Sequence, residues 1–272
     1  MNIPFWKMQG AGNDFILVDD RARTFPVTDR NWIAAVSRRR TGVGCEGVIL
    51  IQPSQESSFC MRFFNPDGSE VEMCGNGARC VARLAHELGA APANLTIETR
   101  AGILRAEVMG QIVRLHLTPP GDWRLNGTLA VAGRELRYGF VNTGVPHVVA
   151  RVENLTDWDV RAMGRAIRYH EAFAPAGANA NFIIVTGPQS IRVRTYERGV
   201  EDETLACGTG IAASALIAAR SGYVTPPVRV TAASGDVLTV DFTLASDGAG
   251  NVTLLGPAVH VFEGVLEYGK KE

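Results

Sequence analysis

Apolar runs separated by polar turns predict a chain built mostly of strands, with few helices between them. In the first half, strands are expected near 3–8, 13–19, 47–52 and 58–64 and within 95–117, with a helix over 75–88. In the second half, strands are expected near 137–152, 181–196 and 227–266, with helices near 159–169 and over 208–220. Because strands come in runs rather than alternating regularly with helices, the pattern favours an α+β fold over a doubly wound parallel sheet.

The predicted helices differ in how much of their surface is apolar. Positions 208–220 are apolar nearly all round, which is typical of a buried helix. Positions 75–88 carry apolar residues on one face and charged residues elsewhere. Near 28–39, Asp29 precedes an apolar stripe and predicts an N-capped helix. The simplest arrangement encloses one helix within the strands of each half.

The chain resembles itself at one constant offset. Met-Cys-Gly-Asn-Gly at 73–77 and Ala-Cys-Gly-Thr-Gly at 206–210 are 133 residues apart. The same offset, without gaps, pairs 47–51 with 180–184, 14–17 with 147–150, and Gly102 with Gly235. One register that joins four segments predicts two similar halves, with a site between them.

Composition and charge narrow the possible functions. Hydrophobic residues make up 46% and charged residues 20% of the chain, as in soluble globular proteins. The net charge is -1, whereas a protein that binds a phosphate backbone carries a basic surplus, so nucleic acid is not an expected partner. The apolar stretch 211–219 is shorter than the roughly 20 residues that span a bilayer. Residues 1–10 lack a secretory signal, so we expect a cytoplasmic protein without a membrane partner.

The cysteine pattern argues against a disulfide framework and against a metal site. Five cysteines are an odd number and include no Cys-x-x-Cys pair, and the five histidines show no paired metal-ligand spacing. Cys74 and Cys207 stand apart, because each precedes Gly-x-Gly and a predicted helix. We expect Cys45, Cys60 and Cys80 to be small buried hydrophobic residues.

A cysteine at a helix start has a distinct chemistry. Unpaired backbone N–H groups and a partial positive charge favour the thiolate and lower the pKa of a cysteine there. The same N–H groups bind anions such as carboxylates, and the neighbouring glycines allow close approach. Two such thiols facing one α-carbon could remove a proton from one face and return one to the other. Either cysteine alone would be assigned to the core, but their duplication favours a racemase or an epimerase.

The segments around both cysteines contain long and specific motifs. The first joins Phe-Asn-Pro-Asp-Gly-Ser-Glu at 64–70 to Met-Cys-Gly-Asn-Gly-Ala-Arg-Cys at 73–80. The second joins Tyr-Glu-Arg-Gly at 196–199 to Glu-Thr-Leu-Ala-Cys-Gly-Thr-Gly at 203–210. Further matches lie at 7–15, 146–147, 178–182 and 256–258. From about residue 7 to about residue 263, the chain resembles the diaminopimelate epimerase family.

The resemblance implies an architecture and a reaction. The fold would have two pseudo-symmetric domains, each a mixed β-sheet curled round a central helix. Residues 1–118 and 259–272 would form the N-terminal domain, and 119–258 the C-terminal domain. The activity would be an isomerase, without pyridoxal phosphate, other cofactor or metal, that interconverts LL- and meso-2,6-diaminopimelate in lysine and cell-wall precursor synthesis. Homodimers are usual in the family.

The resemblance also assigns roles to residues by position. Cys74 and Cys207 would be the two bases, exchanging acid and base roles with the direction of reaction. The backbone that binds the reacting α-carboxylate would come from Gly75, Asn76, Gly208 and Thr209. The rest of the substrate would be held by Asn13, Asn65, Asn179, Glu197 and Arg198. The planar fork of Arg198 suits the distal carboxylate, and His147 and Glu197 would tune the pKa of the thiols.

Structural roles remain the alternative for several of these residues. The three asparagines Asn13, Asn65 and Asn179 could be ordinary turn or cap residues. Arg198 could form a surface ion pair, and His147 could be a hydrogen-bonded core histidine.

Two departures from the family pattern bear on the substrate. Val145 stands where many members have the Asn of Asn-Pro-His, and Cys45-Glu46-Gly47 stands where many have Asp-Gln or Asp-Gly. A site built for a polar substrate end rejects ligands that leave its groups unpaired. The motifs therefore point to epimerisation more strongly than they point to diaminopimelate as the substrate.

Three other functions stay open. Proline and hydroxyproline racemases resemble the same two-cysteine architecture, but Asn65, Asn76 and the Glu197-Arg198 pair favour diaminopimelate. An amino-acid-binding module would not need both cysteines. A redox sensor could form a disulfide between two thiols of low pKa, and loss of activity with loss of titratable thiols after peroxide would reveal it.

Overall fold

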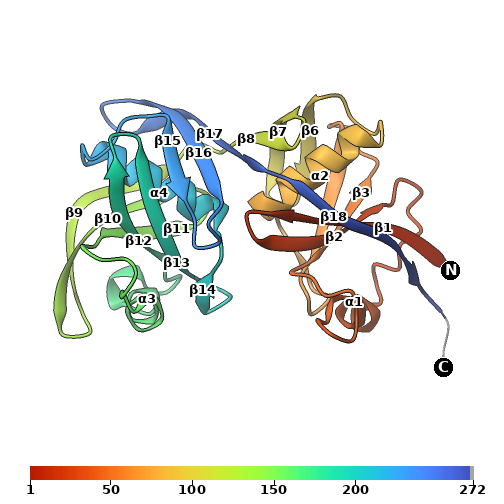
Figure 1. Ribbon diagram of the computed structural model, residues 1–272, viewed down its shortest axis with the longest axis horizontal. Coiled ribbons are helices and arrows are strands. Elements are labelled where there is room, and N and C mark those ends of the chain that lie inside the picture. Colours follow the sequence, from red (N-terminus) through yellow and green to blue (C-terminus); the bar gives the residue numbers. More distant parts are fainter. Residues whose placement is uncertain (270–272) are drawn as a thin grey trace. The chain divides into compact units, whose positions relative to one another are not determined.

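A computed structural model describes residues 1–269 (Figure 1). The chain forms two compact units: residues 1–115 together with the segment from 256 are unit 1, and His116–Leu255 are unit 2. Strands dominate both units and each contains few helices, which confirms the predicted α+β class.

Unit 1 is a mixed sheet with two helices. Its strands are β1 (Asn2–Gly10), β2 (Asn13–Asp19), β3 (Val48–Gln52), β4 (Phe59–Phe64), β5 (Glu70–Val71), β6 (Asn94–Thr99), β7 (Gly102–Met109), β8 (Ile112–His116) and β18 (Val259–Glu267). The helices are α1 (Arg30–Ser37) and α2 (Gly75–Glu87). The order of paired strands is β18-β1-β2-β3-β4-β6-β7, with parallel pairs at β2–β3 and β4–β6. The C-terminal strand β18 therefore pairs with the first strand of the chain.

Unit 2 repeats this arrangement. Its strands are β9 (Gly121–Val131), β10 (Arg134–Asn142), β11 (Pro146–Arg151), β12 (Asn179–Gly187), β13 (Ser190–Glu197), β14 (Asp202–Thr204), β15 (Val228–Thr231), β16 (Val237–Leu244) and β17 (Ala249–Pro257). The helices are α3 (Val160–Arg168), the short 3-10 helix η1 (Glu171–Phe173) and α4 (Gly208–Arg220). The order of paired strands is β9-β10-β11-β12-β13-β15-β16-β17, with parallel pairs at β11–β12 and β13–β15.

The internal duplication extends to the register of the sheets. Ile16 of β2 lies opposite Val48 of β3, and Val149 of β11 lies opposite Asn181 of β12, which are the same positions shifted by the common offset. Helices α2 and α4 both contain 13 residues and begin at equivalent positions. Each unit therefore places the start of its central helix at the equivalent point of its own sheet.

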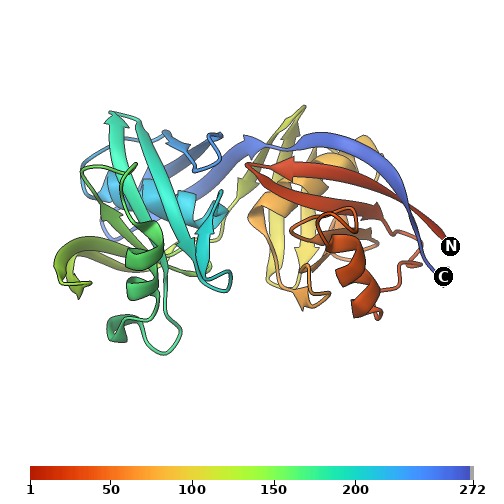
Figure 2. The same cartoon turned by 60° about the horizontal axis from the view of Figure 1, so that its bottom comes forward.

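Each central helix packs on one face of its sheet, and a second hydrophobic core fills the other face. Helix α2 contacts β1, β2, β3 and β7, and α4 contacts strands of unit 2 from β10 to β16 (Figures 1 and 2). On the opposite faces, Ile33 of α1 and Met163 of α3 belong to further buried clusters. Burial on both faces explains the unbroken apolar run 48–51 in β3, because alternate side chains of a strand point to opposite faces.

The predicted elements are present, but the short elements β5, β14 and η1 and the long strand β9 were not expected. Asp29 caps α1 by accepting a hydrogen bond from the Trp32 backbone N–H at 3.0 Å, as its sequence pattern indicates. No strand was expected over 121–131, yet β9 occupies these residues and pairs with β10. Most of β9 alternates between half-buried and exposed positions, and Asp122 and Asn126 adopt positive φ. Trp123, Leu125, Leu129 and Val131 nevertheless alternate with mostly polar residues, and Leu129 and Val131 are buried, so the sequence does carry a strand pattern that the prediction missed.

Within residues 1–269, no helix is long and apolar enough to cross a membrane.

Candidate active site

Cys74 and Cys207 are the N-cap residues of α2 and α4. Both have extended backbones, with φ and ψ of -137° and 122° at Cys74 and -115° and 111° at Cys207. In α1 and α3, by contrast, the N-cap is an aspartate whose carboxylate accepts a hydrogen bond from the first turn. Neither cysteine side chain caps its helix in this way within the described residues. The first-turn N–H groups of α2 and α4 thus lie beside a thiol rather than beside a capping carboxylate.

The two glycines of each Cys-Gly-x-Gly motif have different reasons to be glycine. A Cβ on Gly75 would meet no atom within 4 Å, so a ligand could approach the backbone there. A Cβ on Gly77 would lie 2.6 Å from Cδ1 of Ile49, and one on Gly210 would lie 2.4 Å from Oδ1 of Asn181. The second glycine therefore lets each helix start lie close to the sheet.

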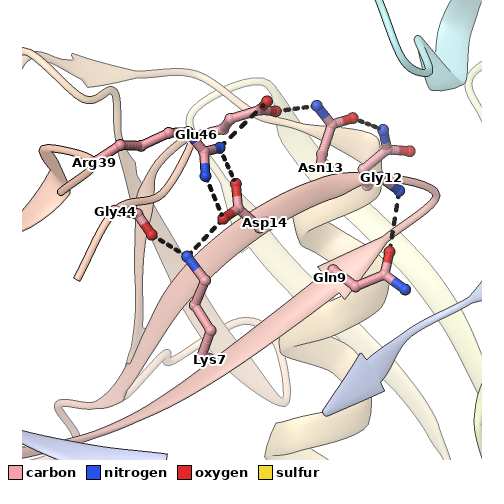
Figure 3. Close-up of polar contacts among 9 residues, drawn as sticks. Lys7, Gln9, Gly12, Asn13, Asp14, Arg39, Gly44 and Glu46 are labelled. Carbon is pink, nitrogen blue, oxygen red and sulfur yellow. Dashed lines mark hydrogen bonds and ion pairs between the residues drawn. The ribbon is translucent and has the colours of Figure 1, made fainter. Parts of the chain in front are cut away.

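In unit 1, the residue two positions after the cysteine is tied to the β1–β2 turn. The buried amide of Asn76 donates to Oδ1 of Asn13, and the amide of Asn13 donates to the carboxylate of Glu46. The structure thus brings together two of the predicted substrate-binding residues. Figure 3 shows Asn13 next to Glu46, and Asp14 on the adjacent position of β2.

Charged side chains surround this group (Figure 3). Asp14 forms ion pairs with Lys7 at 2.7 Å and with Arg39 at 2.6 Å, and Lys7 also donates to the carbonyl of Gly44. Burial alone would raise the pKa of Asp14, but hydrogen bonds from Arg39 and Lys7 lower it below its usual value. Burial dominates at Glu46, where it raises the pKa of the carboxyl group despite the hydrogen bond from Asn13. The turn that contacts the start of α2 is therefore flanked by the ion pairs of Asp14.

In unit 2, a chain of neutral polar groups leads to the thiol. Thr209 lies two positions after the cysteine, and its Oγ1 is 3.5 Å from Sγ of Cys207. Nε2 of His147 lies 3.0 Å from the same Oγ1, and the Thr209 carbonyl accepts from the hydroxyl of Thr143 at 3.0 Å. His147, Cys207 and Thr209 thus lie in one cluster.

His147 is a neutral imidazole in this environment. The side chain is fully buried, and this burial, with the positive charge of Arg198, lowers the pKa of His147 to about 3. Near neutral pH the ring therefore carries one proton and acts as one donor and one acceptor.

The remaining predicted residues of unit 2 lie beside this cluster. Asn179 accepts a hydrogen bond from the Arg198 backbone N–H at 2.7 Å and donates to the Pro146 carbonyl at 3.2 Å. The Arg198 guanidinium donates to the Ala176 carbonyl at 3.2 Å, an exposed contact. Glu197 accepts from the hydroxyl of Thr204 at 2.8 Å. Arg198 is therefore placed by its backbone, and its half-buried side chain makes an exposed contact with the Ala176 carbonyl.

Asn65 lies in the turn between β4 and β5. Its backbone N–H donates to the Ser69 carbonyl at 2.8 Å, and its carbonyl accepts from the Gly68 N–H at 2.9 Å. This geometry accounts for the Asn-Pro-Asp-Gly sequence as a tight turn, with Gly68 at a φ of 79°. Both of these backbone hydrogen bonds stay within the turn, and neither involves Asn13 or Asn76.

The other three cysteines are held as thiols. Burial raises the pKa of Cys45 and Cys60, and raises that of Cys80 to about 12. All five cysteines are free of disulfides. Cys45 and Cys80 are buried, as expected from the sequence, whereas Cys60 is half-buried.

Two polar groups near the candidate site were not singled out from the sequence. Asn181 and Thr195 are both buried and bond to each other beside His147. A lone asparagine in the apolar segment 180–185 was the available signal, because an amide in a buried strand needs specific partners. In the sequence, Glu46 stands out only as a departure from the family pattern. Its contact with Asn13 places it among the polar residues near the start of α2 in unit 1.

A separate cavity in unit 2 does not include the thiol. Its volume is about 450 Å³, and its lining includes Leu155, Arg161, Arg192, Glu203 and Ala232. None of the residues predicted to act on the substrate lines it. Among residues 1–269, no group of three or more His, Cys, Asp and Glu side chains is arranged to hold a metal ion.

Known proteins resemble this chain along nearly its whole length. The family model for diaminopimelate epimerase matches residues 5–116 and 139–261. A diaminopimelate epimerase of Aquifex aeolicus is 46% identical, and the alignment covers 97% of this chain and 99% of that protein. One from Chlorobaculum tepidum is 44% identical, with 99% of its length and 95% of this chain covered.

Solved structures share the fold at much lower identity. A PhzF-family phenazine biosynthesis protein of Bacillus anthracis superposes with a TM-score of 0.72 at 19% identity, over 98% of this chain and 99% of its own. A probable proline racemase of Agrobacterium radiobacter superposes with a TM-score of 0.71 at 15% identity, over 98% of this chain and 93% of its own. These structures support the two-domain fold, whereas the family match and the closely related sequences identify the chemistry class. The chain belongs to the diaminopimelate epimerase family, whose members are isomerases.

Proposed function

We propose that this protein interconverts LL- and meso-2,6-diaminopimelate by a two-base mechanism in which Cys74 and Cys207 are the bases. The observation that carries the proposal is the placement of both cysteines as N-caps of equivalent helices, α2 and α4. A structural cysteine would need no such duplication, whereas inversion at carbon needs one proton-transfer group on each face.

The reaction follows from the chemistry of a helix start. The thiolate of one cysteine takes the α-proton and becomes a thiol, and the electron pair of the C–H bond is delocalised onto the α-carboxylate. First-turn N–H groups at Gly75-Asn76 and Gly208-Thr209 stabilise the charge that develops on that carboxylate. The other thiol gives its proton to the opposite face of the carbon and becomes a thiolate. The reverse reaction exchanges the two roles, so no cofactor is required.

The remaining side chains bind and orient the substrate. Asn13, Asn65 and Asn179 present amides that suit the amino and carboxyl groups of diaminopimelate, and Glu197 suits an ammonium group. The guanidinium of Arg198 suits the distal carboxylate, because its fork can donate two parallel hydrogen bonds. Asn179 fixes the backbone of Arg198 at 2.7 Å, which supports a common role for the two residues.

We place this reaction in lysine and cell-wall precursor synthesis in the cytoplasm, and we expect the protein to act as a homodimer. The family supports the pathway class, and chromatography with light scattering would test the oligomeric state.

The decisive experiment incubates purified, reduced protein with LL-2,6-diaminopimelate in D₂O, without pyridoxal phosphate or added metal. Chiral separation and mass spectrometry are followed together. We expect the meso isomer to form with one deuterium at the inverted carbon, because the proton that is delivered comes from an exchanged thiol.

Two controls separate chemistry from substrate choice. The Cys74→Ala variant should form the meso product about 10² to 10⁴-fold more slowly, and proline should not be racemised by the wild type. Turnover of proline without turnover of diaminopimelate would refute the substrate and leave the two-cysteine chemistry standing.

A further inference from the structure

Asn181 is a buried amide whose orientation is determined by two of its partners. It lies on β12, fully buried, next to the equally buried His147. Its Nδ2 donates to the Val148 carbonyl at 2.9 Å, and its Oδ1 accepts from the Thr195 hydroxyl at 3.0 Å. Because a carbonyl oxygen only accepts hydrogen bonds, the NH₂ end must face Val148. The amide therefore has one orientation.

That orientation determines which nitrogen of His147 carries the proton. The same Nδ2 lies 3.1 Å from Nδ1 of the ring, and an NH₂ group can only donate. Nδ1 must then be the acceptor, so the single proton of the neutral ring lies on Nε2.

The Nε2 proton determines in turn what the Thr209 hydroxyl does. Nε2 lies 3.0 Å from Oγ1 of Thr209, so the ring donates and the hydroxyl oxygen accepts. The hydroxyl has one hydrogen of its own, and Sγ of Cys207 lies 3.5 Å from Oγ1. A donor aimed at sulfur stabilises the thiolate relative to the thiol.

We propose that Asn181 is a positioning residue that holds His147 as its Nε2–H tautomer and thereby commits the Thr209 hydroxyl to the thiolate of Cys207. The opposite tautomer would present a bare Nε2, which would accept the Thr209 hydrogen and draw it away from sulfur. The inference rests on the proposed function only in treating the Cys207 thiolate as catalytic. Unit 1 has Val48 at the position equivalent to Asn181, so this arrangement belongs to one of the two thiols.

The first test observes the tautomer directly. Protein labelled with ¹⁵N in histidine is examined by long-range ¹H–¹⁵N correlation at neutral pH, and the His147 signals are assigned by their loss in His147→Gln. We expect Nε2 to be protonated and Nδ1 to be bare in the wild type. A protonated Nδ1 in the wild type would overturn the proposal, and this result needs no variant of Asn181 that folds.

The second test measures the consequence at sulfur. Alkylation of each cysteine by iodoacetamide is followed against pH by peptide mass spectrometry, with Cys74 as the internal reference. In Asn181→Leu and in Thr209→Val, the pH at which half of Cys207 reacts as thiolate should rise by about half to one pH unit, the size expected for one lost hydrogen bond. The midpoint for Cys74 should not move.

Two matched variants make the test specific. Thr209→Ser keeps the hydroxyl and should keep the wild-type midpoint of Cys207. Thr195→Val removes one partner of Asn181 but leaves the Val148 carbonyl to orient the amide, so its midpoint should stay close to wild type.

An unchanged midpoint in Asn181→Leu, or a shift in Asn181→Leu without one in Thr209→Val, would overturn the relay. These readouts need no substrate, so a failure of diaminopimelate turnover would refute the proposed function and leave the relay standing.

Discussion

The two helix starts have the same backbone and different polar surroundings. In unit 1, the residue that follows Cys74 by two positions is Asn76, and its amide leads through Asn13 to the carboxylate of Glu46. In unit 2, the residue that follows Cys207 by two positions is Thr209, and its hydroxyl leads to the neutral ring of His147. Charged groups thus support one half, and neutral groups support the other.

The equivalent position on the second strand shows the same difference. Asp14 in β2 is ionised and paired with Lys7 and Arg39, whereas its counterpart His147 in β11 is buried and uncharged. The duplicated backbone supplies the same N–H groups in both units, so anion binding needs no further specialisation. The side chains around the backbone are free to differ, and they can make the two thiols chemically unequal.

The largest expected effect tests whether the two halves are both needed. Cys74→Ala and Cys207→Ala should each lower the rate of epimerisation by about 10² to 10⁴-fold, because each removes the acid–base group for one face of the carbon. Chiral analysis with deuterium incorporation measures both inversion and exchange. Cys60→Ala, at a half-buried cysteine of β4, is the control and should keep its activity. Near-full turnover in either active-site variant would refute the two-base assignment.

A second prediction tests the charged support of unit 1. Asp14→Asn should lower the free energy of unfolding by about 3 kcal/mol, because it leaves the buried ammonium of Lys7 without its carboxylate. Arg39→Gln breaks an ion pair to the same carboxylate, but the Arg39 side chain is 60% exposed and the loss should be below about 1 kcal/mol. Urea titration of both variants gives the two values. Equal losses in the free energy of unfolding would show that the buried ion pair with Lys7 contributes no more than the exposed one with Arg39.

A third prediction concerns the substrate end of unit 2. Arg198→Ala should raise KM for diaminopimelate by about 10- to 100-fold, the range expected for a charge-assisted contact with a carboxylate. Arg192→Ala, at an exposed arginine of strand β13, which ends just before Arg198, serves as the matched control and should leave KM unchanged. Steady-state kinetics on both variants tests the assignment. An unchanged KM in Arg198→Ala would remove this residue from the site.

The smallest effect distinguishes a neutral core histidine from an ionised one. His147 has a pKa of about 3 when folded and about 6.5 as its ordinary value, so the unfolded chain takes up this proton first as pH falls. Its contribution to stability is therefore present above pH 6.5 and lost progressively toward pH 3. Between pH 7 and 5.5, the wild type should lose about 1 kcal/mol more than His147→Gln. Parallel slopes in urea titrations of the two proteins would mean that the ring is not held neutral.

Much of this organisation could be predicted from the sequence because it is local. A cysteine before Gly-x-Gly and an apolar helix determines its own position at the helix start, and repetition of that motif indicates two similar units. The caps of α1 and the strands β2, β3 and β4 follow from short-range pattern in the same way. Strand β9 was not predicted, although Trp123, Leu125, Leu129 and Val131 alternate with mostly polar residues as in a half-buried strand.

The sequence by itself determined the fold class, the duplication, the family and the two candidate bases. Only the tertiary structure decided which polar groups surround each base. Asn181 is 34 residues from His147 and Thr209 is 62 residues from it, and no local pattern relates residues that distant. Hydrogen bonds and burial act over a few ångströms in space, so the folded register of β11, β12 and α4 sets the tautomer of His147 and its low pKa.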